Sequence, residues 1–301
     1  MSEPKKQHYV PQTYLRKFSF SDGSVQKIFS LHKDQSKIIC TNIRDTAAER
    51  HFYTIKKSDD QYIWENIYAK EIEPLMSNIL SQITSQCENE LIQDYSFVLT
   101  QEMKKQLSIT MIFQLLRGRQ SREFQRNIYS EVVLSVIKDV RERFLPIDET
   151  KEKILKAAIE EDDYFKLASM QATFDIKRLE KYINILIRKC FLVYRIIDNA
   201  EFITSDNPVM CLDALSLSAK PFNNGLAQNT TVIYFPVTSR LLIAAYDSSF
   251  YLGMLSEYDK RIIFLDSCKD QPFIKMQNQK QYEQCFNQVY AKRKEVLEEL
   301  Y

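Results

Sequence analysis

The spacing of the apolar residues changes twice along the chain, and this limits the possible folds more than any other feature. Apolar and polar residues alternate in V-Q-K-I-F-S-L (25–31), and S-K-I-I-C-T-N-I (36–43) and R-H-F-Y-T-I (50–55) are similarly strand-like. Between 60 and 196 the apolar residues recur instead at i+3 and i+4, the period of a helix. Strand-like runs return over 200–266. A helical middle between two sets of strands is therefore expected.

Proline and glycine divide these regions further. A helix is expected from Trp64 to Ile83, with a kink or a restart at Pro74, because proline lacks the amide hydrogen of a helix interior. The helical pattern of 100–144 is long enough to need a break, and Gly118 is the natural position. The other predicted helices cover 148–170, 175–195 and 278–299, and the predicted C-terminal strands cover 201–204, 231–237, 241–246 and 262–265.

The two sets of strands are expected to share one sheet. The N-terminal strands (1–58) would bury little surface on their own, so pairing with the C-terminal strands (200–266) is the more stable arrangement. The helical middle (60–196) would then cover the sheet, and a terminal helix (278–299) would complete the chain. The sequence thus predicts a single α+β domain over 1–301 with a mainly antiparallel sheet.

Composition and charge exclude several function classes. The chain has 41 Lys and Arg against 40 Asp and Glu, so its net charge of +1 provides no general field for a polyanion, and such a site must be a local patch. Four glycines are too few for a dinucleotide-binding fingerprint or a P-loop. The six cysteines include no C-x-x-C pair, and no apolar run is long enough to span a bilayer. A cytoplasmic protein without a membrane partner is expected.

The segment Q-H-Y-V-P-Q (7–12) contains His8, one of only three histidines. In the simpler interpretation His8 is a partly buried structural residue of an extended entry segment, because Pro11 favours an extended backbone at the residue before it. In the functional interpretation His8 is a general base or acid, since imidazole titrates near neutral pH.

The segment T-S-D-N-P-V (204–209) follows a predicted strand. As a structural feature it is a turn, in which Asp and Asn bond to their own backbone and proline fixes φ. As a functional feature it places Asp206 and Asn207 at the end of a strand, where catalytic side chains are often found. Both interpretations stay open from the residues alone.

Three arginines share one face of a predicted helix. At 100° per residue, Arg119, Arg122 and Arg126 fall within about 60°, whereas Arg117 points elsewhere. Three guanidiniums on one face can clamp a phosphate or a carboxylate. The alternative is a solvated face that pairs with Glu123 and its neighbours.

Two glutamates complete the set of candidate residues. Glu73 lies on the apolar side of its helix, and a buried carboxylate needs a partner such as an arginine of 117–126 or His8. Glu49 would share one strand face with His51. No zinc or EF-hand spacing occurs, but Mg²⁺ needs only one or two carboxylates, so a magnesium site from Asp206 with Glu73 is possible.

These motifs resemble, in their order, the microbial family known as domain of unknown function 4238. The shared segments are H-Y-V-P-Q-T-Y-L-R-K-F (8–18), A-E-R-H-F-Y (48–53), I-E-P-L-M-S-N-I-L (72–80), F-I-T-S-D-N-P-V (202–209) and I-Y-F-P-V-T (233–238). The resemblance implies a cytosolic protein with no established activity. The family positions that it carries over are His8, Pro11, Glu49, Glu73, Arg117, Asp206, Asn207 and Pro208.

Two functions from different classes follow. In the first, the protein is a hydrolase, a nuclease-like effector acting on RNA or a nucleotide, as in phage defence or as a toxin. The catalytic candidates are His8, Glu73, Asp206 and Asn207, and the substrate-binding candidates are Arg117, Arg119, Arg122, Arg126 and Glu49. In the second, the protein is a recognition module for a protein partner, and His8 and S-D-N-P are structural staples. Nucleic-acid binding without chemistry is a third, weaker interpretation.

Overall fold

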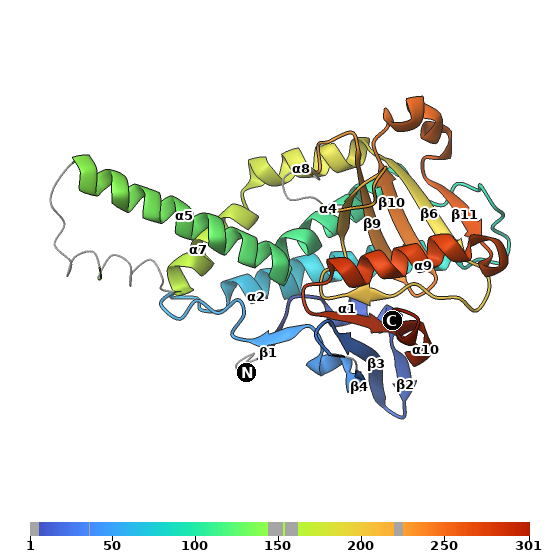
Figure 1. The fold of residues 1–301 in the computed structure, drawn as a ribbon, viewed down its shortest axis with the longest axis horizontal. Coiled ribbons are helices and arrows are strands. Elements are labelled where there is room, and N and C mark those ends of the chain that lie inside the picture. Colours follow the sequence, from blue (N-terminus) through green and yellow to red (C-terminus); the bar gives the residue numbers. More distant parts are fainter. Residues whose placement is uncertain (1–5, 36, 144–152, 154–161, 220–224) are drawn as a thin grey trace.

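The chain adopts an α+β fold, as predicted (Figure 1). The structure is a computed structural model that describes residues 6–35, 37–143, 153, 162–219 and 225–301. Strands from both parts of the sequence form two larger sheets and one short ladder, and the helices pack around them.

The first sheet joins the two ends of the chain. Its N-terminal strands are β2 (Phe20–Asp22), β3 (Val25–His32) and β4 (Ile38–Asn42), and its C-terminal strands are β7 (Thr204–Ser205) and β12 (Gln288–Ala291). Val289 of β12 stands opposite Leu31 on one side and Ser205 on the other, both in antiparallel register. The predicted sharing of a sheet by the two ends is therefore confirmed.

The second sheet contains the other C-terminal strands. It has the order β11-β6-β10-β9-β8, formed by β6 (Cys190–Ile196), β8 (Met210–Asp213), β9 (Thr231–Thr238), β10 (Leu241–Tyr246) and β11 (Arg261–Leu265). Only the β11–β6 pair is parallel. Most C-terminal strands thus belong to a sheet of their own and do not pair with the N-terminal ones.

A short ladder pairs β1 (Lys6–His8) with β5 (Ala48–Arg50). The strand predicted at 50–55 is wrong, because β5 ends at Arg50 and His51 has a left-handed φ of 55°. Since that conformation interrupts the pleat, Glu49 and His51 do not share a strand face.

The first long helices break where the sequence indicates. α2 (Ile63–Ile67) and the π-helical turn η3 (Tyr68–Ile72) lead into α3 (Glu73–Cys87), which has Pro74 in its first turn, where the missing amide hydrogen costs nothing. Gly118 separates α4 (Gln101–Arg117) from α5 (Arg119–Arg143). The shorter elements are α1 (Gln12–Leu15), η1 (Arg16–Phe18), η2 (Ile43–Asp45) and η4 (Phe250–Tyr258).

Three other helix predictions need correction. The predicted helix 148–170 lies partly outside the described residues, which contain α7 (Asp162–Thr173). The predicted helix 175–195 ends with α8 (Ile176–Arg188), because C-F-L-V-Y-R-I is rich in β-branched and aromatic residues and forms β6 in the sheet interior. The predicted helix 278–299 is divided into the end of α9 (Ser267–Gln284), β12 and α10 (Lys294–Glu298).

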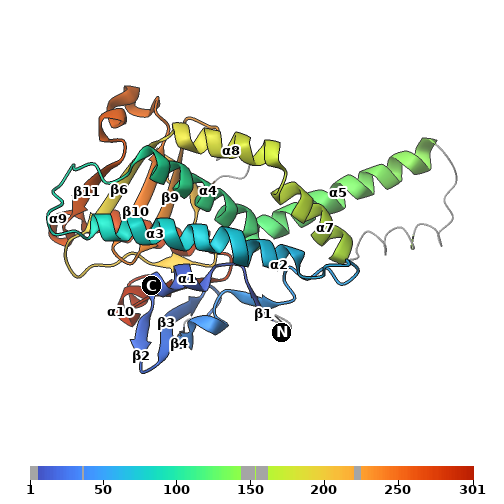
Figure 2. The same ribbon diagram turned by 180° about the vertical axis from the view of Figure 1, so that it is seen from behind.

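Helices cover both faces of the second sheet. Figure 2 shows α3 and α4 on one face, and Figure 1 shows α9 on the other. Ile233 and Phe235 of β9 belong to the larger core with α3 and α4, whereas Tyr234 packs in the core that contains Ile274 of α9. This alternation is the two-residue period of β9, with both faces buried. α5 and α7 extend from this body to one side (Figure 1).

Candidate functional site

The H-Y-V-P-Q-T-Y segment near the N-terminus and the strand before S-D-N-P (205–208) meet in the folded protein. The Tyr14 hydroxyl, at the end of the H-Y-V-P-Q-T-Y segment, lies 2.7 Å from Thr204 Oγ1 and donates to the Pro236 carbonyl at 2.7 Å. All of these atoms are buried. The N-terminal segment is thus bonded directly to the strand that precedes S-D-N-P.

His8 is held by bonds on both ring nitrogens. Nδ1 lies 3.1 Å from the Thr46 carbonyl, to which it must donate, and Nε2 lies 3.0 Å from the Gln12 amide nitrogen, from which it must accept. Burial lowers the pKa of His8 to about 4, with the Thr46 carbonyl opposing this shift. The imidazole is therefore neutral at pH 7, and both nitrogens are already bonded.

Arg117 links the N-terminal segment to two helices. It is buried, and its Nη2 donates to the His8 carbonyl at 2.6 Å and to Glu73 Oε1 at 3.0 Å. The guanidinium lies 4.2 Å from the centre of the Tyr68 ring. Glu73 therefore has the arginine partner that its position on an apolar helix face required.

Asp206 and Asn207 bind the end of α9 and β12. The buried Asp206 carboxylate accepts from the backbone N–H groups of Phe286 (2.7 Å), Asn287 (2.7 Å) and Gln288 (3.1 Å). Burial raises the pKa of Asp206 to about 6, while these three donors oppose the rise. The Asn207 amide donates to the Gln284 carbonyl at 3.0 Å and to Gln120. Neither side chain bonds to His8 among the described residues.

The proposed magnesium pair does not fit this geometry. Asp206 directs both oxygens at three backbone donors, and Oε1 of Glu73 is ion-paired with Arg117, so the two carboxylates serve different parts of the fold. Within the described parts of the chain, no group of three or more His, Cys, Asp or Glu is placed to hold a metal ion.

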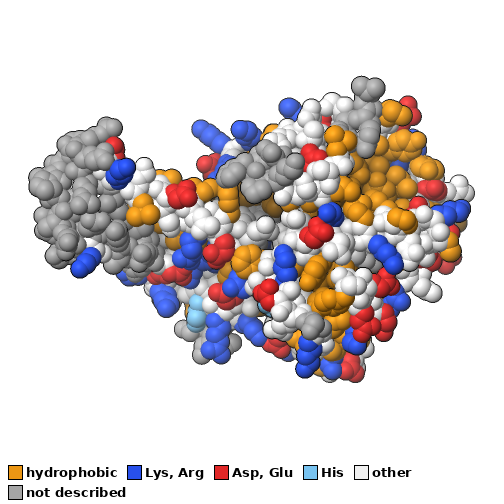
Figure 3. All heavy atoms as spheres, viewed as in Figure 1, with side chains coloured by type: hydrophobic (Ala, Val, Ile, Leu, Met, Phe, Trp, Pro, Cys, Tyr) orange, Lys and Arg blue, Asp and Glu red, His pale blue; other side chains and the backbone are white. Residues whose placement is uncertain are grey.

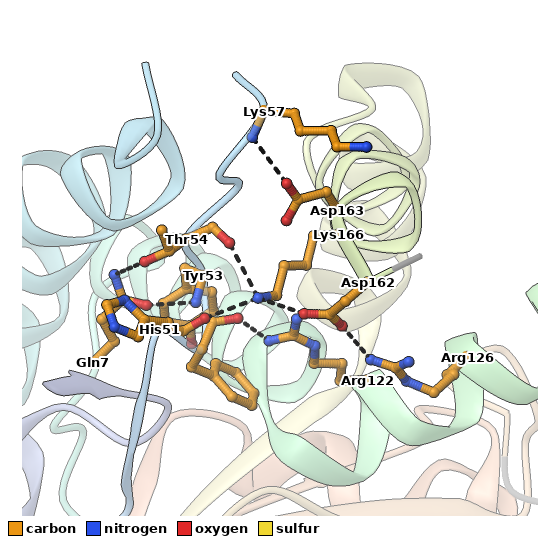
Figure 4. Close-up of polar contacts among 11 residues, drawn as sticks. Gln7, His51, Tyr53, Thr54, Lys57, Arg122, Arg126, Asp162, Asp163 and Lys166 are labelled. Carbon is orange, nitrogen blue, oxygen red and sulfur yellow. Dashed lines mark hydrogen bonds and ion pairs between the residues drawn. The ribbon is translucent and has the colours of Figure 1, made fainter. Parts of the chain in front are cut away.

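Arg119, Arg122 and Arg126 line a pocket of about 490 Å³, here called the arginine pocket. α5, α7 and the segment 49–57 form its walls (Figure 4). The other lining residues are Glu49, Arg50, His51, Phe52, Lys56, Lys57, Glu123, Asp162, Asp163 and Lys166. The structure thus brings together the three arginines that the helical spacing predicted, with Glu49 beside them.

Arg122 is the most buried arginine of the pocket. Its guanidinium lies 4.2 Å from the centre of the Phe52 ring, and Nη1 donates to the Phe52 carbonyl. The four other N–H groups of this guanidinium have no hydrogen-bond partner among the described residues. Burial lowers the pKa of Arg122, an effect that the Asp162 charge opposes, so the cation is poorly solvated.

Asp162 joins Arg126 to a lysine that sequence reasoning missed. One carboxylate oxygen lies 2.6 Å from Arg126 Nη2 and the other 2.6 Å from Lys166 Nζ. Lys166 is buried and also donates to the carbonyls of His51 at 2.9 Å and Thr54 at 3.1 Å (Figure 4). The sequence feature that could have revealed Lys166 is its spacing of four residues from Asp162 on a helix, but ion pairs at that spacing are usually exposed to solvent.

Arg119 and Glu123 lie on the wall nearest to S-D-N-P. Arg119 Nη2 is 3.6 Å from Glu49 Oε2, and its guanidinium lies 5.2 Å from the Phe286 ring. Glu123 has arginines one helical turn away on each side, but these pair with Glu49 and Asp162. The Glu123 carboxylate has no ion-pair partner in the described portion of the chain. Among the described residues, Arg119 and Arg126 thus pair with Glu49 and Asp162, and not with Glu123 as in the alternative interpretation of the arginine face.

The arginine pocket concentrates positive charge. Seven of its lining residues are Lys or Arg and four are Asp or Glu, an excess of three positive charges in a chain whose net charge is +1. Figure 3 shows Lys and Arg among Asp and Glu on the face below α5 and α7. The pocket is thus a local basic patch, the only kind of polyanion site that a net charge of +1 allows.

Asn207 lies outside the arginine pocket. It lines a larger, mostly apolar cavity of about 1240 Å³, whose walls include Leu116 of α4 and Tyr182 of α8. Arg119, Arg122 and Arg126 do not line that cavity, and Glu123 is the residue that both share. The catalytic candidates His8, Glu73, Asp206 and Asn207 thus do not line the arginine pocket.

Fold and site together define an α+β protein with a basic pocket between α5, α7 and the segment 49–57. The chain belongs to the family described as "Protein of unknown function (DUF4238)", whose model matches residues 6–295. No curated protein and no solved structure matches the chain. None of the helices described has the length and apolar character needed to cross a membrane.

Proposed function

We propose that this protein is a hydrolase that binds RNA or a nucleotide by its phosphates in the arginine pocket and cleaves a phosphodiester bond. The observation that carries the proposal is the convergence of Arg119, Arg122 and Arg126 on one pocket with an excess of three positive charges. A volume of about 490 Å³ lies within the range of small-molecule sites.

Arg122 and Arg126 are the residues best suited to hold the phosphate. Four N–H donors of Arg122 have no partner in the part of the chain that the structure describes, while burial deprives its charge of solvent. Arg126 is fixed by Asp162 and by the Phe165 ring, 4.4 Å from its guanidinium. Cations pre-positioned in this way stabilise the charge that develops on phosphate oxygens during cleavage.

Glu123 is the general base in this proposal. Its carboxylate lines the arginine pocket and has no ion-pair partner among the described residues, so it can orient a water molecule and accept its proton. The water oxygen bonds to phosphorus, the bond to the leaving oxygen breaks, and that oxygen takes a proton from solvent. His8, the base expected from the sequence, has both ring nitrogens bonded.

Binding and turnover are tested separately with three variants. Arg126→Gln is expected to weaken phosphate-ligand binding about tenfold, the equivalent of one charge-assisted bond. Glu123→Gln is expected to keep binding and to lower turnover of RNA or nucleotide at least a hundredfold. Arg188→Gln, on the exposed end of α8, is the matched control. Absence of both binding and turnover in the wild type at low salt would refute the proposal.

A second candidate, a non-catalytic module that recognises a protein partner, is favoured by a different observation. The side chains of His8, Asp206 and Asn207 are all bonded to other parts of the fold, as expected for structural staples. Both proposals predict that Ala at His8 or Asp206 lowers the melting temperature by several degrees. This one alone predicts that the wild type turns over neither RNA nor a nucleotide, so that no Glu123 or Arg126 variant alters a biochemical activity.

The cellular role that accompanies the first proposal is a cytoplasmic effector in bacteria, acting in phage defence or as a toxin. Expression of the wild-type protein should slow growth and degrade RNA or deplete nucleotides, whereas Glu123→Gln should not. Equal growth and equal nucleic-acid content with both proteins would contradict this role.

A further inference from the structure

Among the described residues that line the arginine pocket, the aromatic rings are those of His51 and Phe52. His51 is partly exposed, whereas Phe52 is only 5% exposed. Its ring contacts the Arg122 guanidinium at 4.2 Å, the Tyr53 ring at 4.7 Å and the Tyr9 ring at 5.3 Å. Proteins that hold single-stranded RNA along its chain stack its bases on exposed aromatic rings. The described lining therefore offers seven Lys and Arg side chains to phosphate groups and only the His51 ring to a base.

The cations extend beyond the reach of one phosphate group. Arg119 and Arg126 are seven residues apart on α5, which corresponds to about 10 Å along the helix axis. Arg122 lies between them, and Lys56 lines the wall of segment 49–57. Several linked phosphates can contact these groups together, and their charge matches the excess of three positive charges better than one diester phosphate does.

We infer that the arginine pocket binds a 5′-polyphosphate chain, with the nucleoside to which it is attached outside the pocket. This inference rests on the proposed function and specifies its ligand class, with a phosphoanhydride of the polyphosphate chain in place of the phosphodiester as the bond held in the pocket. The same chemistry occurs in a free nucleoside triphosphate and at the 5′-triphosphate end of an RNA. Binding should be nearly independent of the base, because the nucleoside lies outside the pocket.

The experiment measures dissociation constants at one fixed low salt concentration. The ligands are ATP, GTP, AMP, inorganic triphosphate and one RNA oligonucleotide with either a 5′-triphosphate or a 5′-hydroxyl. We expect ATP and GTP to agree within threefold and to bind at least tenfold more tightly than AMP. Inorganic triphosphate should compete, and the 5′-triphosphate RNA should bind at least tenfold more tightly than the 5′-hydroxyl RNA.

Two variants test whether the triphosphate binds in the arginine pocket. The affinities for ATP and for the 5′-triphosphate RNA are then compared. Arg126→Gln should weaken ATP binding at least tenfold, whereas Arg188→Gln should change it less than twofold. A preference for 5′-triphosphate RNA over ATP, or the reverse, supports the inference and identifies the source.

Two outcomes overturn the inference. If AMP or the 5′-hydroxyl RNA binds as tightly as its triphosphate form, and Arg126→Gln abolishes that binding, the inference fails while the proposed function survives. If none of these ligands binds, both fail.

Discussion

The pH dependence of stability distinguishes a structural His8 from a catalytic one. His8 bonds to the Thr46 carbonyl through Nδ1 and to the Gln12 amide through Nε2, and burial lowers its pKa to about 4. In the unfolded chain the pKa of histidine is about 6.5. Because the folded state resists protonation, the stability linked to His8 is present above pH 6.5 and is lost as the pH falls toward 4.

The magnitude follows from the size of the pKa shift. A difference of about 2.5 pKa units corresponds to about 3 kcal/mol, at about 1.4 kcal/mol per unit. The comparison variant is His8→Asn, whose amide can donate to the Thr46 carbonyl and does not titrate. The free energy of unfolding of the wild type, minus that of His8→Asn, should therefore fall by about 3 kcal/mol between pH 7 and pH 4.

Urea unfolding of both proteins at pH 7, 6, 5 and 4 measures this difference. Subtracting the two free energies of unfolding cancels the pH dependence that comes from titrating groups shared by both proteins. Asp206 is one such group, because burial raises its pKa to about 6. A difference that stays constant within about 0.5 kcal/mol over this pH range would refute the structural role, since it would show that His8 titrates equally in both states.

Three further predictions concern other parts of the molecule. Asp206→Ala should lower the free energy of unfolding by at least about 3 kcal/mol, because the three N–H groups of 286–288 lose their acceptor; a loss under 1 kcal/mol in urea unfolding would contradict this. Arg117→Met should cost about 3 kcal/mol in the same assay, since it leaves Glu73 and the His8 carbonyl unpaired, whereas Arg188→Met should cost less than 0.5 kcal/mol. A thiol reagent at pH 7 should modify Cys40 and Cys268 rapidly and the buried Cys87, Cys190 and Cys285 only on unfolding, because burial raises the pKa of each of these three to about 12; rapid reaction of more than three thiols would refute this, since Cys211 is half-buried.

Features with strong local signals could be predicted from the sequence. Pro74 and Gly118 mark helix boundaries because their backbone chemistry acts locally. The arginine face of α5 follows from helical spacing alone, and all three arginines line one pocket. The joining of the chain ends was predicted from the instability of an isolated N-terminal sheet.

Features that depend on tertiary contacts could not be predicted. β12 lies in a charged segment with a helical pattern, and it is a strand because β3 and β7 pair with it on both sides. The left-handed turn at His51 has no glycine to reveal it. Lys166 is buried because the carbonyls of His51 and Thr54 happen to face it, and no spacing in the sequence connects these positions.

The central claim is that phosphate groups bind in the arginine pocket. A crystal structure of the protein with a non-hydrolysable nucleoside triphosphate tests this claim most directly. We predict phosphate oxygens within hydrogen-bond distance of Arg122 and Arg126, with the base outside the pocket. Phosphates bound elsewhere on the protein, or a base inserted between α5 and α7 in place of the phosphates, would contradict the claim.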